Sequence, residues 1–423
     1  MFGFLRILLL SAAAGVLAAA APANLDREIV LAPHSGAAVE DAEITRWQER
    51  AGAPGANAAT FAGLGWAYST KARRTLDAGF HKLAEKTADV VDAEFGATLE
   101  SRRLRAHALH NLHRFHEAET VARQLVTEAN APADLALLSD ALVEQGEIAE
   151  GVEVLQRMVN LKPGVEAFSR IAQVRWLKGD PAGATAAMEM AWRAAGRDEA
   201  ETQAWLLVRL SGFSLQGGEV DRALALAEEA NTRLPDYPPA LLASGRALLA
   251  QKKSGEAIVR LVRADVLLPL PEYQWWLADA LVAAGRPDEA AVVEQRLRKH
   301  GATEDPRTFS LFLATRRIDA GVALRLTRAE LRERADVFSQ DAAAWALFTS
   351  GDVAAADRTM RLALKEGTRD ARLSLHAAEI ARASGRTLEA REHLTRAKAS
   401  AGTLLPSERV WLDAAARELV AIE

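Results

Sequence analysis

The residues that come closest to a chemical signature are four histidines in one short segment. His107, His110, His113 and His116 follow one another at three-residue spacing, in a chain that has nine histidines in all. Neutral imidazole is a common metal ligand, so a metal site is one interpretation of the cluster. On a single helix, however, each three-residue step turns the side chain back by about 60°. Four such rings would fan across half of the circumference, and we therefore predict that the cluster holds no metal.

Other catalytic signatures are missing from the sequence. It has no glycine-rich phosphate loop, no nucleophile elbow and no His-Glu-x-x-His motif. It has no cysteine, which excludes disulfides, a thiolate nucleophile, a cysteine-ligated metal and a lipid-modified N-terminal cysteine. The net charge is −5, and the mixed charges form no basic stripe of the kind that binds nucleic acid. These observations predict a protein that is not an enzyme, takes no cofactor and does not bind nucleic acid.

An alanine, which we call the repeat alanine, recurs along the chain at intervals close to 33 residues. Gly151 takes its place once, and a turn glycine lies five residues before it in six units. A period of this length indicates stacked units of two helices. The small residue allows the two helices to cross closely, and the glycine ends the first helix by adopting a positive φ. The repeat alanines are Ala84, Ala118, Ala184, Ala223, Ala257, Ala290, Ala323, Ala356 and Ala390, and the turn glycines are Gly146, Gly179, Gly218, Gly285, Gly351 and Gly385.

This pattern resembles the tetratricopeptide repeat family, whose consensus is W-x2-L-G-x2-Y, then A-x3-F, then P. Phe61-x2-Leu64-Gly65-x2-Tyr68 matches the first part, with Phe in place of Trp. The unit at Ala323 is the weakest, because Ile318 stands where the turn glycine is expected. The resemblance implies an all-α fold. We expect a right-handed α-solenoid of about ten tetratricopeptide-type helix hairpins over residues 57–402.

The two ends of the chain do not follow the repeat. Residues 1–23 are typical of a signal peptide, with Arg6 before an apolar stretch and small residues that favour cleavage after Ala20 or Ala23; an uncleaved anchor is the alternative. Residues 24–56 predict a linker and a short helix, and residues 403–423 predict a C-terminal capping helix. The chain also resembles exported bacterial tetratricopeptide proteins of unassigned role, which implies a periplasmic location.

In tetratricopeptide arrays the first helix of each unit lines an inner groove, and the resemblance assigns this role by phase. The groove residues mix large aromatic and charged groups, which is the composition of binding hot spots. We predict that at least three of Trp66, Trp176, Trp275 and Trp345 are exposed in it. The full set is Trp66, Arg103, His107, His110, Asn111, Asp140, Glu144, Gln173, Trp176, Arg246, Trp275, Asp279, Phe312, Asp341, Trp345, Phe348, Glu379 and Arg382.

The sequence favours a non-enzymatic scaffold of the bacterial cell envelope that binds a protein or peptide partner along this groove. One alternative is a metal-dependent protein or enzyme that uses His107 to His116. Another is a structural spacer in a secretion or envelope complex, which would use its ends or its convex face. The identity of the partner, the biological process and the oligomeric state do not follow from the sequence.

Overall fold

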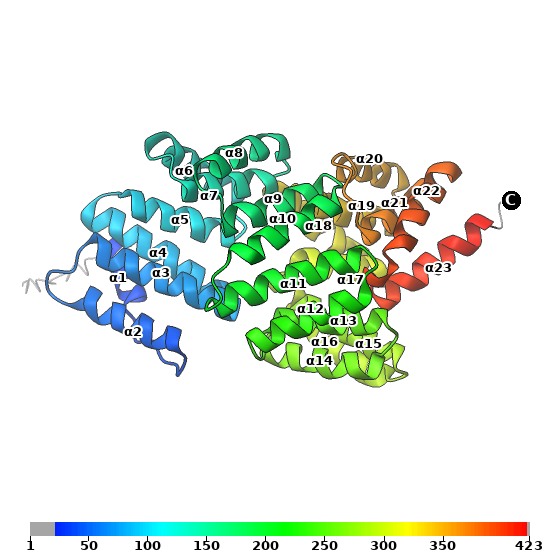
Figure 1. The fold of residues 1–423 in the computed structure, drawn as a ribbon, viewed down its shortest axis with the longest axis horizontal. Helices are drawn as coiled ribbons and strands as arrows, with labels where there is room; N and C mark the ends of the chain where they lie inside the picture. Colours follow the sequence, from blue (N-terminus) through cyan, green and yellow to red (C-terminus); the bar gives the residue numbers. More distant parts are fainter. Residues whose placement is uncertain (1–21, 421–423) are drawn as a thin grey trace, which may run out of the picture. The chain divides into compact units, whose positions relative to one another are not determined.

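The computed structural model describes residues 22–420 of the chain, and every regular element in that range is helical (Figure 1). The predicted all-α class is confirmed. Residues 1–21, which carry most of the predicted signal peptide and the candidate cleavage residue Ala20, lie outside the described residues.

The helices from α3 to α22 form ten consecutive hairpins, as the repeat predicts. The solenoid of tetratricopeptide-type hairpins is therefore confirmed. The bounds are α1 Pro22–Val30, α2 Val39–Gly52, α3 Ala58–Thr75, α4 Ala78–Phe95, α5 Leu99–Asn111, α6 Phe115–Glu128, α7 Pro132–Glu144, α8 Ile148–Leu161, α9 Val165–Leu177, α10 Pro181–Ala194, α11 Ala200–Gln216, α12 Val220–Arg233, α13 Pro238–Ala250, α14 Ser254–Leu267, α15 Pro271–Ala283, α16 Pro287–Glu304, α17 Pro306–Arg316, α18 Ala320–Glu333, α19 Val337–Thr349, α20 Val353–Ala363, α21 Ala371–Ala383, α22 Thr387–Ala399, the 3-10 helix η1 Ala401–Thr403 and α23 Pro406–Val420.

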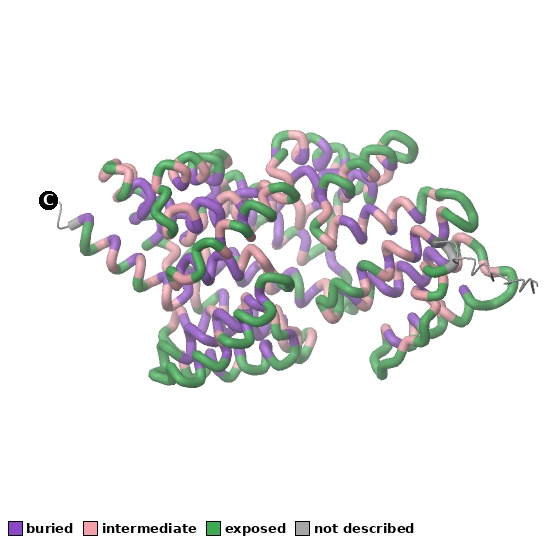
Figure 2. Tube along the Cα trace, turned by 180° about the vertical axis from the view of Figure 1, so that it is seen from behind, coloured by how far each residue is buried: buried purple, intermediate pink, exposed green. Residues whose placement is uncertain are grey.

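The repeat alanines mark the crossing of the two helices of a hairpin. Each lies on the second helix of its pair, and none is more than 2% exposed. Gly151 holds the same position on α8, where an added Cβ would lie 2.8 Å from Val143 Cγ2. Buried residues recur along the whole array in the same way (Figure 2). The register that the alanines predict is correct.

The turn inside each hairpin uses the left-handed backbone region. All six turn glycines have positive φ, which glycine adopts without strain. Two hairpins place His113 and Lys252 at the same position, also with positive φ. In the weak unit the turn is built instead from Arg317 and Asp319, on either side of Ile318, with φ of 55° and 47°. The repeat spacing is kept in this unit although the turn glycine is absent.

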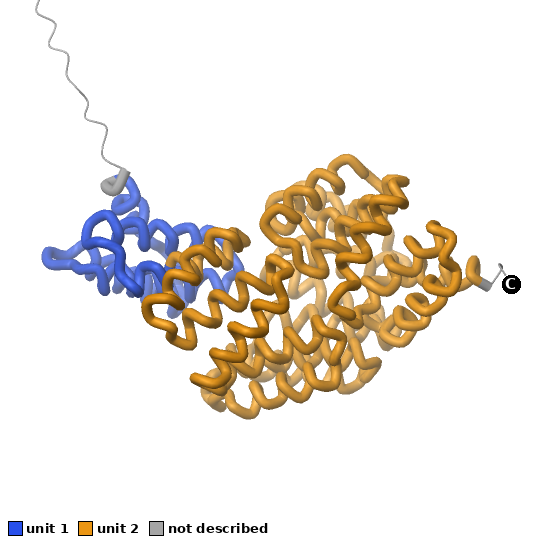
Figure 3. Tube along the Cα trace, turned by 90° about the horizontal axis from the view of Figure 1, so that it is seen from above, with its two compact units in different colours: residues 1–104 blue, residues 105–423 orange. Residues whose placement is uncertain are grey.

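The described chain divides within α5 into two compact units, which we call unit 1, up to residue 104, and unit 2, from residue 105 on (Figure 3). In unit 1, polar contacts tie the N-terminal helices to the first hairpin. The Tyr68 hydroxyl donates to Val30 O over 2.6 Å, and buried Asp41 pairs with Lys71 Nζ over 2.8 Å. Hydrogen bonding to Lys71 lowers the pKa of Asp41 to about 2. The proposed divisions at residues 56 and 402 remain interpretations of the repeat pattern.

Within unit 2 the superhelix returns on itself, so hairpin turns meet segments that lie much later in the sequence. Thr368 Oγ1 donates to Leu177 O over 2.5 Å, and Ser400 Oγ donates to Gln216 O over 2.5 Å. A Cβ added to Gly146 would lie 2.7 Å from Ala335 O. The turn glycine therefore also permits close contact between successive superhelical turns. This closure determines which groove positions stay open.

Candidate binding site

The predicted groove residues fall into two parts of unit 2 with different surroundings. We call α9, α11 and α13 the open half, and α15, α17, α19 and α21 the filled half. In the filled half, Trp275 is 2% exposed and Trp345 is 1% exposed. The expectation that at least three of the four groove tryptophans are exposed is therefore wrong.

The C-terminal helix α23 covers the inner side of the filled half. Trp411 packs edge-on against Trp345, with ring centroids 4.9 Å apart, and its Nε1 donates to Thr315 O over 3.3 Å. The backbone N of Ser407 donates to Asp279 Oδ2 over 2.8 Å. The helix at the end of the chain thus packs into the groove as well as against the last hairpin, and it contributes to the burial of Trp345.

The charged groove positions of the filled half have partners inside the protein. Asp279 pairs with Arg316 Nη2 over 2.7 Å, Asp341 with His376 Nδ1 over 2.8 Å, and Glu379 with Arg382 Nη2 over 2.9 Å. All three carboxylates are buried. Burial raises the pKa of Asp279, and the charge of Arg316 opposes that shift.

Aromatic side chains pack in the remaining part of the filled half. Phe312 is fully buried and packs edge-on against Trp275, with centroids 5.8 Å apart. Trp345 stacks on His376 at 4.0 Å and on half-buried Phe348 at 5.2 Å. These side chains are core residues of unit 2, so their residue types stabilise the fold.

A hollow of 360 Å³ lies mainly over the open half, and a second hollow, of 220 Å³, is lined mostly by residues of the filled half. They are adjacent, because Gln216, Arg246, Glu272 and Asp370 line both. Helices α11 and α13 supply most of the first hollow, with Trp176 from α9 at its edge. The second is more polar and is lined by charged groups of both signs, among them Arg246, Arg307, Arg372, Glu272, Asp305, Asp341 and Asp370.

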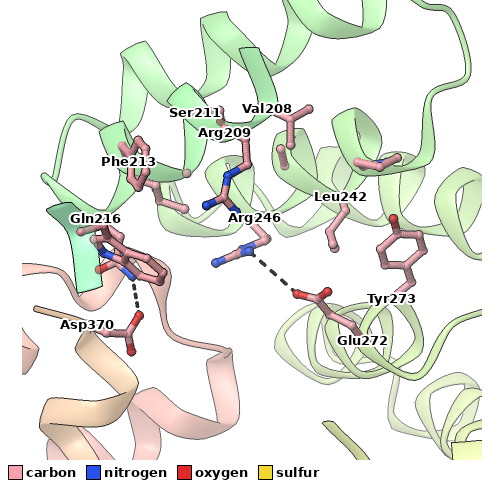
Figure 4. A pocket seen from close by; sticks show the side chains of 15 residues that line it. Val208, Arg209, Ser211, Phe213, Gln216, Leu242, Arg246, Glu272, Tyr273 and Asp370 are labelled. Carbon is pink, nitrogen blue, oxygen red and sulfur yellow. Dashed lines mark hydrogen bonds and ion pairs between the residues drawn. The ribbon is translucent and has the colours of Figure 1, made fainter. Parts of the chain in front are cut away.

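Two arginines from neighbouring hairpins point into the first hollow (Figure 4). Arg209 Nη2 donates to Gln173 Oε1 over 2.5 Å. Arg246 Nη1 lies 3.9 Å from Glu272 Oε1, and its buried Nε has no hydrogen-bond partner. Burial lowers the pKa of both arginines.

Sequence reasoning found Gln173, Trp176 and Arg246 in this region but missed Arg209. The repeat spacing contained the information needed to identify Arg209. Gly212 lies eleven residues before its repeat alanine, as Gln173 and Arg246 do. Arg209 is three residues before Gly212, so both lie on the same face of α11. Because glycine has no side chain, the sequence analysis did not assign this position to the groove.

The histidine cluster lies where the repeat phase predicts. His107 and His110 are on α5, His113 is in the turn and His116 is in the first turn of α6. Their contacts diverge: His110 packs edge-on against Phe115, whereas His116 Nε2 is 3.0 Å from Arg332 O. Within residues 22–420, no group of three or more His, Cys, Asp or Glu side chains is arranged to hold a metal ion.

The remaining groove residues of the first hairpins of unit 2 have local partners. Asn111 Nδ2 donates to His107 O over 2.8 Å. Arg170 makes two hydrogen bonds to Asp140, of 2.8 and 2.7 Å. Glu144 pairs with Arg334 at 2.5 Å, which ties α7 to the segment before α19. Burial raises the pKa of Glu144.

Two predicted groove residues belong to unit 1, and one lies at the end of the filled half. Trp66 is half-buried, and its Nε1 donates to Glu100 Oε1 over 2.7 Å. Arg103 lies 3.8 Å from the same carboxylate. Arg382 pairs with Glu418 of α23 over 2.7 Å. A role in partner binding stays a prediction for the whole groove set.

No protein-family model matches the sequence, and no curated protein is significantly similar to it. Human IFIT1, in a dimer with PPP-AAAA, is 14% identical with a TM-score of 0.48, and the match covers 89% of this chain and 93% of that one. PilW, a type IV pilus biogenesis factor, is 14% identical with a TM-score of 0.42, covering 51% of this chain and 98% of its own.

A third similar structure is the APC/C hetero-tetramer Cut9–Hcn1, at 12% identity and a TM-score of 0.33, which covers 93% of this chain and 99% of that one. No helix in the described part of the chain is long and apolar enough to cross a membrane.

Proposed function

We propose that this protein is a non-enzymatic scaffold of the bacterial cell envelope that binds a segment of a partner protein on the inner face of unit 2. The observation that carries the proposal is the pair of adjacent hollows on the inner face, which share Gln216, Arg246, Glu272 and Asp370. Their lining mixes aromatic side chains with charges of both signs. Aromatic anchors supply buried area, and charges supply register.

A site-specific cross-linker tests this assignment in cells. Val208 lines the first hollow, and Val259 on α14 is 68% exposed and is absent from both hollows. A photo-reactive residue at Val208 should capture a defined partner protein, and the same residue at Val259 should not. Capture from Val259 alone, or equal capture from both, would instead support the spacer, which uses its outer surface.

Export is tested separately. N-terminal sequencing of the protein from a periplasmic extract should show a chain that begins after Ala20 or Ala23. A protein that keeps residue 1 and fractionates with the membrane would replace the periplasmic scaffold with an anchored one. That result would leave the assignment of the inner face to the cross-linking experiment.

A further inference from the structure

Beyond partner binding, we propose that the first hollow is a site for a small organic anion. The acidic group of the ligand, a carboxylate or a phosphate ester, lies against Arg209 and Arg246. Its apolar part lies against the aromatic and aliphatic wall of the same hollow. This inference goes beyond the proposed scaffold function, because it concerns a small molecule and does not depend on a partner protein.

The first argument is positive charge that the protein leaves unneutralised. Arg209 forms no ion pair with the residues described, and its hydrogen bond goes to the neutral amide of Gln173. Arg246 is 3.9 Å from Glu272, which is too far for a hydrogen bond. Arginine remains protonated in proteins, so two partly desolvated cations face one hollow. A charge removed from water is unfavourable unless it is paired.

The acidic residues around the hollow supply that pairing only in part, because Glu272 forms a long ion pair with Arg246 and no described acid pairs with Arg209. Asp370 Oδ2 accepts a hydrogen bond of 2.6 Å from Gln216 Nε2, and its Oδ1 accepts one of 3.1 Å from Leu373 N at the start of α21. Arg372, which lines the second hollow, pairs with Glu408. Burial and the positive charge of Arg372 lower the pKa of Arg246, although Glu272, Asp370 and Glu408 act in the opposite direction. An external anion is the group that this arrangement lacks.

The second argument is space that a glycine creates. Gly212 lies inside α11 and lines the hollow, at the groove position that Gln173 and Arg246 hold in the neighbouring units. Glycine in a helix interior is unfavourable by roughly 1 kcal/mol relative to alanine. No atom lies within 4 Å of a Cβ added to Gly212, so packing within the protein does not require it. In this proposal the ligand occupies the space beside Gly212.

The third argument is the chemistry of the wall. Trp176, Phe213 and Leu242 line the hollow. Trp176 stacks on Phe338 at 5.2 Å, and its buried Nε1 has no hydrogen-bond partner. The volume of 360 Å³ lies at the lower end of the range of about 300–1,000 Å³ for small-molecule sites, which combine apolar walls with a few placed polar groups. Size and composition both point to a small amphipathic ligand.

The test measures the binding of four organic anions to the purified protein by calorimetry and saturation-transfer NMR. The probes are benzoate, 4-phenylbutyrate, hexanoate and phenyl phosphate, and the amides of the three acids are their neutral counterparts. We expect at least one anion to bind with a Kd of roughly 1 mM or tighter, a range that small fragments reach. Its neutral counterpart should bind at least tenfold more weakly. A phosphate ester that binds while every carboxylate fails would assign the acidic group as phosphate.

Three variants locate the site. Arg209→Met and Arg246→Met should each weaken the anion by roughly tenfold or more, because each removes a charged hydrogen-bonding group. Gly212→Leu should abolish binding by filling the hollow, while its thermal midpoint stays at or above that of the wild type. Arg260→Met is the matched control, since Arg260 pairs with Glu228 on the outer helices over 3.1 Å.

The proposal is overturned if no probe binds the wild type, if acids and amides bind equally, or if Gly212→Leu binds as the wild type does. Loss of folding in one arginine variant does not obscure the result, because Gly212→Leu reports on the hollow independently. Cross-linking from Val208 tests the partner-binding role by a different readout. A failure of the anion site and a failure of the scaffold function are therefore distinguishable.

Discussion

The groove position eleven residues before the repeat alanine has opposite surroundings in the two halves of unit 2. In the open half it faces a hollow, and in the filled half it is part of the core. Gly212 and Arg246 line the first hollow and Gln173 lines a smaller one, whereas Asp279, Phe312, Trp345 and Glu379 are buried in the filled half. The same repeat phase therefore fixes the direction of a side chain without fixing whether a partner can reach it.

The difference arises from segments that the repeat does not contain. Helix α23 covers the filled half through Trp411 and Ser407. No comparable element of the described chain covers Arg209 and Arg246, so these arginines line a hollow instead of an ion-paired interior. At this groove position the large side chains of Phe312 and Trp345 pack inside unit 2, whereas Gly212 lines a hollow.

Among the variants that test this comparison, Trp345→Ala should have the largest effect on the free energy of unfolding. The Trp345 side chain is fully buried between His376, Phe348 and Trp411, so truncation should lower the free energy of unfolding by about 3–5 kcal/mol. Urea denaturation followed by circular dichroism measures the shift.

Trp176→Ala is the matched variant from the open half. Trp176 is half-buried at the edge of the first hollow, and its truncation should cost about 1–2 kcal/mol. If both variants shift the midpoint equally, the two halves are packed alike and the distinction between them is wrong.

A smaller, local effect should follow from Trp411→Ala. This change removes the ring that packs on Trp345 and its hydrogen bond to Thr315 O. We expect α23 to be destabilised by about 2 kcal/mol, since Trp411 is only half-buried. Hydrogen exchange of α23 should accelerate roughly thirtyfold while the other hairpins keep their protection.

Val410→Ala is the control for that experiment, because Val410 is 66% exposed on the same helix. It should leave the exchange of α23 unchanged. Faster exchange throughout unit 2 in Trp411→Ala would mean that α23 is an integral part of the core and does not act as a separate cover.

The sequence determined the fold well because repeat spacing reports local geometry. Small residues at Ala257 and Ala290 and positive φ at Gly285 are requirements of single hairpins, and they can be identified from residue type. The number of hairpins follows from counting them. Even the turn at Ile318, where no glycine is present, kept its length and so its place in the array.

The site could not be predicted to the same extent, because its accessibility depends on contacts between residues far apart in the chain. Trp345 meets Trp411, and Gln216 meets both Asp370 and Ser400. Nothing in the period of the repeat states how many units complete one superhelical turn. Arg209 was overlooked for a related reason, since the open space that gives it importance is made by Gly212.

The smallest predicted effect is also the most direct test of that open space. Gly212→Ala should stabilise the protein, by up to about 1 kcal/mol, because alanine favours the helix and no atom lies within 4 Å of the added Cβ. Gly245 on the next inner helix is the matched control: its Cβ would lie 2.7 Å from Leu261 Cδ2 and Cγ. Gly245→Ala should therefore destabilise by about 1–3 kcal/mol through overpacking. Thermal unfolding of the two variants should shift in opposite directions. If Gly212→Ala is destabilising as well, the first hollow is closed around α11 in solution, and the contrast between the open and filled halves does not hold.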